Sequence, residues 1–476
     1  MSLQFITGNS GNGKTKYLFN RIVKEAKANP RDNYLVIVPE QFTMQTQRQL
    51  VDLSENKAIM NIDVLSFKRL AYRVFDELGI TNLTVLEETG KNLVLRKLAA
   101  QEADKLGVIG RNLNRIGYIS EVKSLLSELV QYNISPEELG RYIASGRLSD
   151  TLSDKLKDVL VLYEAFEKFM QDKYITAEEI LNVLSNVAEE SAILRNSVIA
   201  FDEFTGFTPI QNQLIKKLFV ISKKIYVTLT IDCREDIFKS RGMQELFDMP
   251  KRTVKSLTEM AAFYGIEVEE PIILDKNYRL AENEELSFME QQLFRKRRCS
   301  FKKVPKHIHI DCLRDPKQEL TKIARRINEL VRNENLRYRD IAIVTGDVNI
   351  YAGYVREIFD KYNIPYFIDA TQEILFHPFI EFIRSIPDIA AQNFSADAVF
   401  RFLRCGFSEL LDSEIDVLEN YVLACGVRGK SAWDKKWVRL PKHKAGYDIE
   451  LLNQSREYIM ELLKPVYQVF SDKSQR

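Results

Sequence analysis

The sequence has few of the residues that build disulfide frameworks, zinc sites and disordered tracts. Its 476 residues include five cysteines, four histidines, 19 glycines and 13 prolines. The cysteines are widely spaced and form no Cys-x-x-Cys pair, which favours reduced thiols over disulfides and gives no zinc-site spacing. Scarce glycine and proline, beside 20 tyrosines and 27 phenylalanines, argue against long disordered segments.

An excess of charge of one sign is also lacking. The 68 Lys and Arg residues nearly cancel the 67 Asp and Glu residues, for a formal net charge of +1. This balance argues against a polybasic protein whose whole surface binds nucleic acid. No apolar run approaches the ~18–20 residues that span a bilayer, and the N-terminus lacks a signal-peptide layout. We expect a cytoplasmic protein, with no membrane contact, of roughly two to four domains.

Hydrophobic patterning predicts an α/β domain with a helical insertion. Apolar runs typical of buried parallel strands, separated by helical segments, occur at Leu3–Thr7, Tyr34–Val38, Ile62–Leu65, Ser197–Phe201, Lys224–Thr230 and Pro271–Leu274. Residues 86–189 between them are almost entirely helical in pattern. We therefore expect a discontinuous domain of residues 1–85 and 190–294, interrupted by a helical insertion at 86–189.

A second unit is expected beyond a basic stretch. Residues 295–306 hold seven Lys or Arg in twelve positions, and are either a solvated linker or a phosphate contact. Short apolar runs alternate with helices at His307–Cys312, Ile341–Thr345 and Tyr366–Ile368. They predict that residues 307–376 begin a second parallel-sheet domain. Residues 377–476 have a helical pattern and contain both tryptophans, so we expect a second helical insertion there, cut short.

A nucleotide-binding loop follows the first predicted strand. Residues Gly8-Asn9-Ser10-Gly11-Asn12-Gly13-Lys14-Thr15 satisfy G-x-x-x-x-G-K-[ST] between a strand and a helix. Glycines let backbone N–H groups surround a phosphate at the positive end of the helix dipole. Lys14 is then expected on the β- and γ-phosphates of ATP, and the Thr15 hydroxyl on Mg²⁺. The alternative is an ordinary glycine-rich turn.

A pair of carboxylates is expected to complete this site. The apolar strand Val198–Phe201 ends in Asp202-Glu203, as a Walker B element does. Asp202 would hold Mg²⁺, and Glu203 would orient the attacking water if ATP is hydrolysed. The alternative is a simple turn at the end of a strand.

The order of these elements resembles superfamily 1 helicases. Asn277-Tyr278-Arg279 matches their N-Y-R motif, which implies that Arg279 approaches the γ-phosphate. Ile231–Glu235 looks like a degraded third motif, Thr205 replaces a usual Gln, and the arginine motifs of the second domain are not found. The resemblance implies RecA-like P-loop domains with large helical insertions and only part of an ATPase site.

A closer resemblance is to the AddB family, the B component of the bacterial AddAB-type ATP-dependent helicase–nuclease. The segments that carry it are Val38–Thr43, Asp63–Leu70, Asp202–Pro209, Tyr338–Ala342, Leu418–Tyr421 and Gly426–Gly429. It implies an ATP- and single-strand DNA-binding subunit that pairs with an AddA-type motor–nuclease subunit. Such a heterodimer processes double-strand DNA ends for recombinational repair, and the AddB-type partner scans for a hotspot sequence.

The same resemblance sets limits on this chain. The family's nuclease domain and iron–sulfur cluster lie in a C-terminal part beyond residue 476, so none of the five cysteines is assigned to a cluster. We expect the sequence to be a front part of a longer protein. By itself it is expected to show little or no ATPase activity and no nuclease activity.

Candidate DNA contacts cluster after three strand ends, where open parallel sheets place ligands. They are Gln41, Thr43, Phe67, Arg69, Tyr72 and Phe207. Aromatic stacking and guanidinium hydrogen bonds are what recognition of a single strand requires. The alternative is that Phe67 and Phe207 are core residues and Arg69 pairs with an acid.

Two other functions remain open. The chain is alternatively an autonomous superfamily 1 ATPase that moves along DNA. A P-loop nucleotide kinase or small-molecule ATPase is disfavoured by the N-Y-R motif and the large helical insertions.

Overall fold

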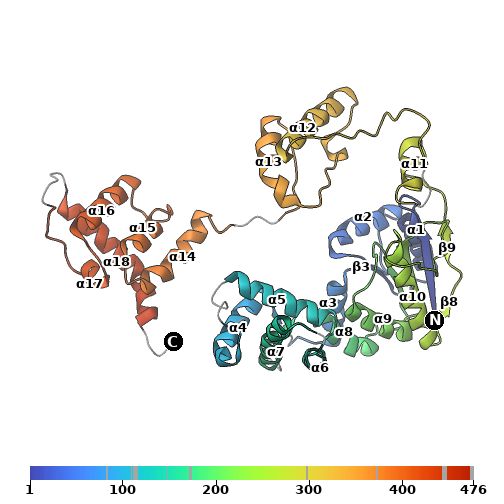
Figure 1. The fold of residues 1–476 in the computed structure, drawn as a ribbon, viewed down its shortest axis with the longest axis horizontal. Coiled ribbons are helices and arrows are strands. Elements are labelled where there is room, and N and C mark those ends of the chain that lie inside the picture. The colour runs from blue at the N-terminus through green and yellow to red at the C-terminus, as the bar shows by residue number, and fades with distance from the viewer. Residues whose placement is uncertain are drawn as a thin grey trace. The chain divides into compact units, whose positions relative to one another are not determined.

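The computed structural model describes residues 1–81, 84–108, 110, 116–146, 148–170, 174–295, 299–370, 374–441 and 447–471. Contacts divide the chain into two compact units, Met1–His309 and Ile310–Arg476 (Figure 1). No helix in the described ranges is both long enough and apolar enough to cross a membrane.

The first unit is built on a parallel sheet. Its strands are β1 (Ser2–Gly8), β2 (Tyr34–Ile37), β3 (Ile62–Leu65), β6 (Val198–Phe201), β7 (Lys224–Thr230), β8 (Glu267–Val268) and β9 (Ile272–Leu274). Their order is β3-β2-β6-β7-β1-β8, with β9 also paired to β1, and every pairing is parallel. The six predicted strands are confirmed, and β8 is the one that the sequence pattern missed.

Helices cover both faces of this sheet because side chains alternate along each strand. One face carries Ile6, Val36 and Ala200 and packs against α1 (Lys14–Ala28) and α2 (Thr43–Leu53), which follows the 3₁₀ turn Glu40–Phe42. The opposite face carries other residues of the same strands. The helices packed on it are α3 (Phe67–Leu78), α8 (Ile180–Val187), α9 (Pro209–Ile221) and α10 (Asp248–Phe263).

The predicted insertion has its own core. Its helices are α4 (Glu88–Gln101), α5 (Ile116–Gln131), α6 (Pro136–Ala144) and α7 (Asp150–Met170), with a 3₁₀ turn at Ala103–Lys105. Leucines and aromatics of these helices form a cluster separate from the sheet core. The insertion is bounded by a two-stranded parallel pair, β4 (Val85–Leu86) and β5 (Ile175–Thr176). By contrast, α8 and the following 3₁₀ turn Ala188–Glu190 pack into the core of the sheet domain.

The second unit starts with a helix pair, α12 (Pro316–Asn333) and α13 (Val348–Lys361), packed on each other around Leu320 and Phe359. A 3₁₀ turn, Tyr338–Asp340, lies between them. The strands predicted at 307–312, 341–345 and 366–368 are wrong, because none of these described segments forms a strand. Parallel strands need paired neighbours and covered faces. Here Val344 and Phe367 are 92% and 89% exposed. The second RecA-like domain therefore stays a prediction.

The rest of this unit is helical, as predicted. Its helices are α14 (Pro378–Ala391), α15 (Ala396–Leu403), α16 (Asp412–Cys425), α17 (Lys430–Asp434) and α18 (Ile449–Ser471). Trp433 is fully buried at its centre and packs against Phe400 and Trp437.

Candidate nucleotide-binding site

The loop between β1 and α1 has the backbone that its glycines make possible. Gly11 and Gly13 have φ angles of 88° and 78°, in the left-handed region that favours glycine. A Cβ atom on Gly11 would lie 2.8 Å from both Arg279 Cβ and Asn277 Oδ1. The N–H of Tyr278 donates to the Gly11 carbonyl at 3.0 Å. The predicted N-Y-R segment therefore packs directly on the loop.

The asparagine side chains of the loop hold it to its surroundings. Asn9 donates through Nδ2 to Glu290 Oε1 at 2.8 Å and accepts through Oδ1 from the N–H of Cys233 at 2.9 Å. The Asn12 amide donates to the Leu274 carbonyl. Asn277 Nδ2 donates to the Ser10 carbonyl at 2.9 Å. Since these side chains face the protein, the loop backbone is the part left to bind a ligand.

Lys14 begins α1 and lies over the loop. Its Nζ donates to the carbonyls of Gly8 and Asn9 at 3.1 Å and 3.0 Å. Burial lowers the pKa of Lys14, while the nearby carboxylates of Asp202 and Glu203 oppose that effect. The ammonium is bound only to neutral carbonyls, so an anion such as phosphate would be a stronger partner.

Asp202 presents an unsatisfied oxygen to the same place. It lies just past the end of β6 and is 1% exposed. Its Oδ1 accepts from the Thr228 hydroxyl, whereas its buried Oδ2 has no hydrogen-bond partner among the described residues. Burial raises the pKa of this carboxyl. A buried carboxylate oxygen without a partner is costly unless a ligand satisfies it.

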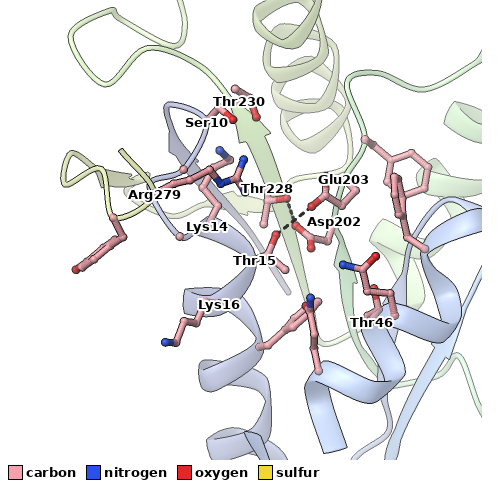
Figure 2. Close-up of a pocket in the computed structure, with 18 of the residues that line it drawn as sticks. Ser10, Lys14, Thr15, Lys16, Thr46, Asp202, Glu203, Thr228, Thr230 and Arg279 are labelled. Carbon is pink, nitrogen blue, oxygen red and sulfur yellow. Dashed lines mark hydrogen bonds between the residues drawn. The ribbon is translucent and has the colours of Figure 1, made fainter. Parts of the chain in front are cut away.

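Glu203 and Thr15 complete the constellation. Glu203 has a φ of 63°, uncommon for a residue with a side chain. Thr15 Oγ1 lies 3.3 Å from Glu203 Oε1. Figure 2 shows Thr15, Asp202 and Glu203 pointing toward one another, with Thr228 behind them.

These residues line one pocket of about 760 Å³. Arg279 and Tyr278 lie on its wall, as do Lys16 on α1 and Gln45 and Gln49 on α2. The motifs alone had not indicated Thr228, Glu290 or the α2 glutamines as parts of the site. Thr228 had a usable signal, since it is a polar residue within a buried strand. The α2 residues carry no motif, and only the fold brings them there.

The residues present fit Mg²⁺ bound with a nucleotide. No group of three or more His, Cys, Asp or Glu side chains that could hold a metal ion occurs among the residues described. Asp202 Oδ2 and the Thr15 hydroxyl offer two oxygens of the kind that Mg²⁺ prefers, and phosphates and waters supply the others. The cysteines that the structure describes are all free thiols.

The predicted DNA residues occupy a different part of the same sheet edge. Gln41 is exposed, and Tyr72 is 39% exposed with its ring against Phe75. Arg69 is exposed, and its Nε donates to Glu40 Oε1 at 2.9 Å.

The other three have partners in the interior. Thr43 is buried and donates its hydroxyl to the Glu40 carbonyl at 3.0 Å. Phe67 is 7% exposed, with ring centroids 5.8 Å from Phe201 and 6.3 Å from Phe207. For Thr43, Phe67 and Phe207 these contacts support the packing alternative, and their DNA role stays a prediction.

A charged cluster lies where β7 ends, in the segment predicted to be a degraded helicase motif. Asp232 is 1% exposed and accepts two hydrogen bonds from the Arg234 guanidinium, at 2.8 Å and 2.6 Å. Arg295 Nε donates to it at 2.9 Å, with its guanidinium over the Phe247 ring. Burial opposes ionisation of Asp232, but hydrogen bonds from Arg234 outweigh it and lower the pKa to about 2. Thus the first residue of the basic stretch is anchored, not solvated.

Comparisons with known proteins agree with this geometry. The family model described as "ADDB, N-terminal" matches residues 5–290. The AddB-type ATP-dependent helicase/deoxyribonuclease chain of Lachnoclostridium phytofermentans is 38% identical over 99% of this chain, and the proteins of the same name from Clostridium tetani and Clostridioides difficile are each 33% identical over 98%. The chain spans 42%, 41% and 41% of these relatives' lengths. Because the family model covers more than half of the sequence, this chain belongs to the AddB family, in its N-terminal part.

Proposed function

We propose that this chain is the ATP-binding, helicase-like part of a helicase–nuclease subunit. The observation that carries the proposal is the convergence of Lys14, Thr15 and the unsatisfied Asp202 oxygen on one pocket beside a glycine loop. The relatives are named as components of an ATP-dependent helicase/deoxyribonuclease, which supports the same assignment.

Each residue has a definite task in this proposal. The loop N–H groups and Lys14 bind the phosphates, and Thr15 and Asp202 hold Mg²⁺. Bound Mg²⁺ neutralises phosphate charge. Glu203 and Arg279 line the pocket and act as catalytic residues only if ATP is hydrolysed.

The proposal extends to DNA and to a partner protein. Gln41, Arg69 and Tyr72 are the exposed candidates for single-strand contact at the carboxyl edge of the sheet. The partner is a motor–nuclease subunit of the AddA type, and the heterodimer processes double-strand breaks in the cytoplasm while the AddB-type chain recognises a hotspot sequence. This part is supported by family membership.

One substitution in the intact heterodimer tests the assignment. Lys14→Ala is expected to leave unwinding in place and to alter only the response to the hotspot sequence. Loss of unwinding would show instead that this chain is itself a motor.

ATP turnover by the chain alone separates the accessory role from an autonomous translocase. Glu203 and Arg279 on the pocket wall are the observation that favours the translocase. We expect negligible DNA-stimulated hydrolysis, because the second-domain arginine motifs are not found in the sequence. Robust turnover would establish the autonomous ATPase.

A further inference from the structure

Helix α11 (Glu284–Gln292) is attached to the nucleotide loop near its C-terminal end. Glu290 accepts the hydrogen bond from Asn9 Nδ2 at 2.8 Å, and Asn9 also holds the end of β7 through the Cys233 N–H. The carbonyl of Asn9 is one of the two that hold the Lys14 ammonium. Glu290 is also one of the charges that act on Lys14, after burial, Asp202, Glu203 and Arg279.

The first turn of α11 holds a different segment. Glu285 is 9% exposed, and its two oxygens accept from the backbone N–H groups of Lys306 and His307 at 2.7 Å and 2.8 Å. Beside it, Glu284 pairs with Lys303. These residues immediately precede His309, where the first unit ends.

A third attachment fixes the chain just after α11. Arg295 is 13% exposed, and Asp232 binds it at the end of β7. The helix is therefore held to the nucleotide loop, to the end of β7 and to the segment that leads out of the unit. No other described helix has all three of these attachments.

We propose that α11 couples nucleotide binding at the loop to the segment Lys303–His309. A triphosphate at the loop brings negative charge close to Glu290 and draws Lys14 away from the Asn9 carbonyl. Repulsion between like charges in a partly buried place then weakens the Glu290–Asn9 hydrogen bond. As α11 loosens, Glu285 releases the N–H groups of Lys306 and His307. This coupling rests on the proposed function, because it requires nucleotide at the loop.

Hydrogen exchange of the full chain measures the coupling directly. Magnesium-free ATPγS at saturation is expected to accelerate exchange of the Lys306 and His307 amides about fivefold, an ordinary coupling strength. The amides of Gly8–Thr15 report binding itself and should become protected. Unprotected loop amides would contradict the proposed function. A protected loop with unchanged Lys306 and His307 amides would overturn the coupling alone.

Three variants separate the hydrogen bond from the charge. Glu290→Gln keeps an acceptor for Asn9, so its nucleotide-free exchange should equal wild type while the response to ATPγS is lost. Glu290→Ala removes the acceptor and should exchange rapidly even without nucleotide. The matched control is Glu282→Gln, at an exposed glutamate just before the same helix, and it should behave as wild type. A full response in Glu290→Gln would overturn the proposal.

Discussion

Two parts of one sheet edge differ in how far their polar groups are satisfied. Past β1 and β6, the Asp202 Oδ2 atom is buried without a partner among the residues described, and Lys14 is bound only to carbonyls. Past β2 and β3, Glu40 already accepts from the Ser66 hydroxyl and from Arg69, and Phe67 is enclosed by aromatic rings. Parallel strands end at both places, so topology alone does not distinguish them.

The difference shows what a strand end needs in order to bind a ligand. Buried polar atoms are almost always paired in folded proteins, so an unpaired oxygen near an ammonium that has only neutral partners indicates a missing ligand. A carboxylate paired with a hydroxyl and a guanidinium indicates a finished structure. The nucleotide part is incomplete without its ligand, whereas the β2–β3 part is complete, and it can bind DNA only through its exposed side chains.

The largest expected effect tests whether Phe67 is a packing residue. Phe67→Ala should lower the free energy of unfolding by about 3 to 5 kcal/mol, because it empties a buried aromatic cluster. Phe67→Leu should cost roughly 1 to 2 kcal/mol. Urea unfolding measures both. If Phe67→Leu keeps its stability but loses affinity for single-stranded DNA, the ring contacts DNA and the comparison fails at this residue.

The next effect tests the glycine loop. Gly11→Ala adds a Cβ atom 2.8 Å from Arg279 Cβ at a φ of 88°. The strain should weaken ATP binding about 100-fold, or roughly 3 kcal/mol. Fluorescent nucleotide titration measures this. Gly79→Ala is the control, since Gly79 has a similar φ of 69° and open space around it. Equal nucleotide affinity in both variants would contradict the role of Gly11.

A smaller effect concerns the Asp232 cluster that supports the nucleotide part. Its pKa of about 2 lies below the ordinary value of 3.8. Its contribution to stability is therefore present above pH 4 and lost as pH falls toward 2, and it amounts to about 2 kcal/mol. Urea unfolding of Asp232→Asn should show lower stability at neutral pH and a shallower decline from pH 5 to 3. An unchanged pH profile would show that the cluster contributes nothing.

The smallest effect is expected at Arg69. Arg69→Gln should change stability by less than about 1 kcal/mol, because its ion pair with Glu40 is exposed. If Arg69 contacts phosphate, single-strand affinity should fall several-fold, and the salt dependence should lose about 0.7 of its log–log slope. Arg73→Gln is the matched control on the same helix, at a similarly exposed arginine. Equal losses in both variants would indicate only a general charge effect.

Local pattern was enough to predict the first domain and the motif part of the site. The P-loop carries its own signal, and continuous apolar runs mark strands that are buried on both faces. The pattern failed at residues 341–345 and 366–368, because a strand also requires paired neighbours, which a local run does not reveal. Whether Phe67 faces DNA or the core also depended on tertiary contacts with Phe201, Phe204 and Phe207.

Calorimetric titration of ATPγS, with and without Mg²⁺, into wild-type chain and Asp202→Asn tests the central claim most directly. If the unpaired Asp202 oxygen awaits a metal, Mg²⁺ should tighten ATPγS binding to wild type by about tenfold or more and should have little effect on the variant. Equal Mg²⁺ dependence in both proteins, or no binding to wild type, would contradict the account.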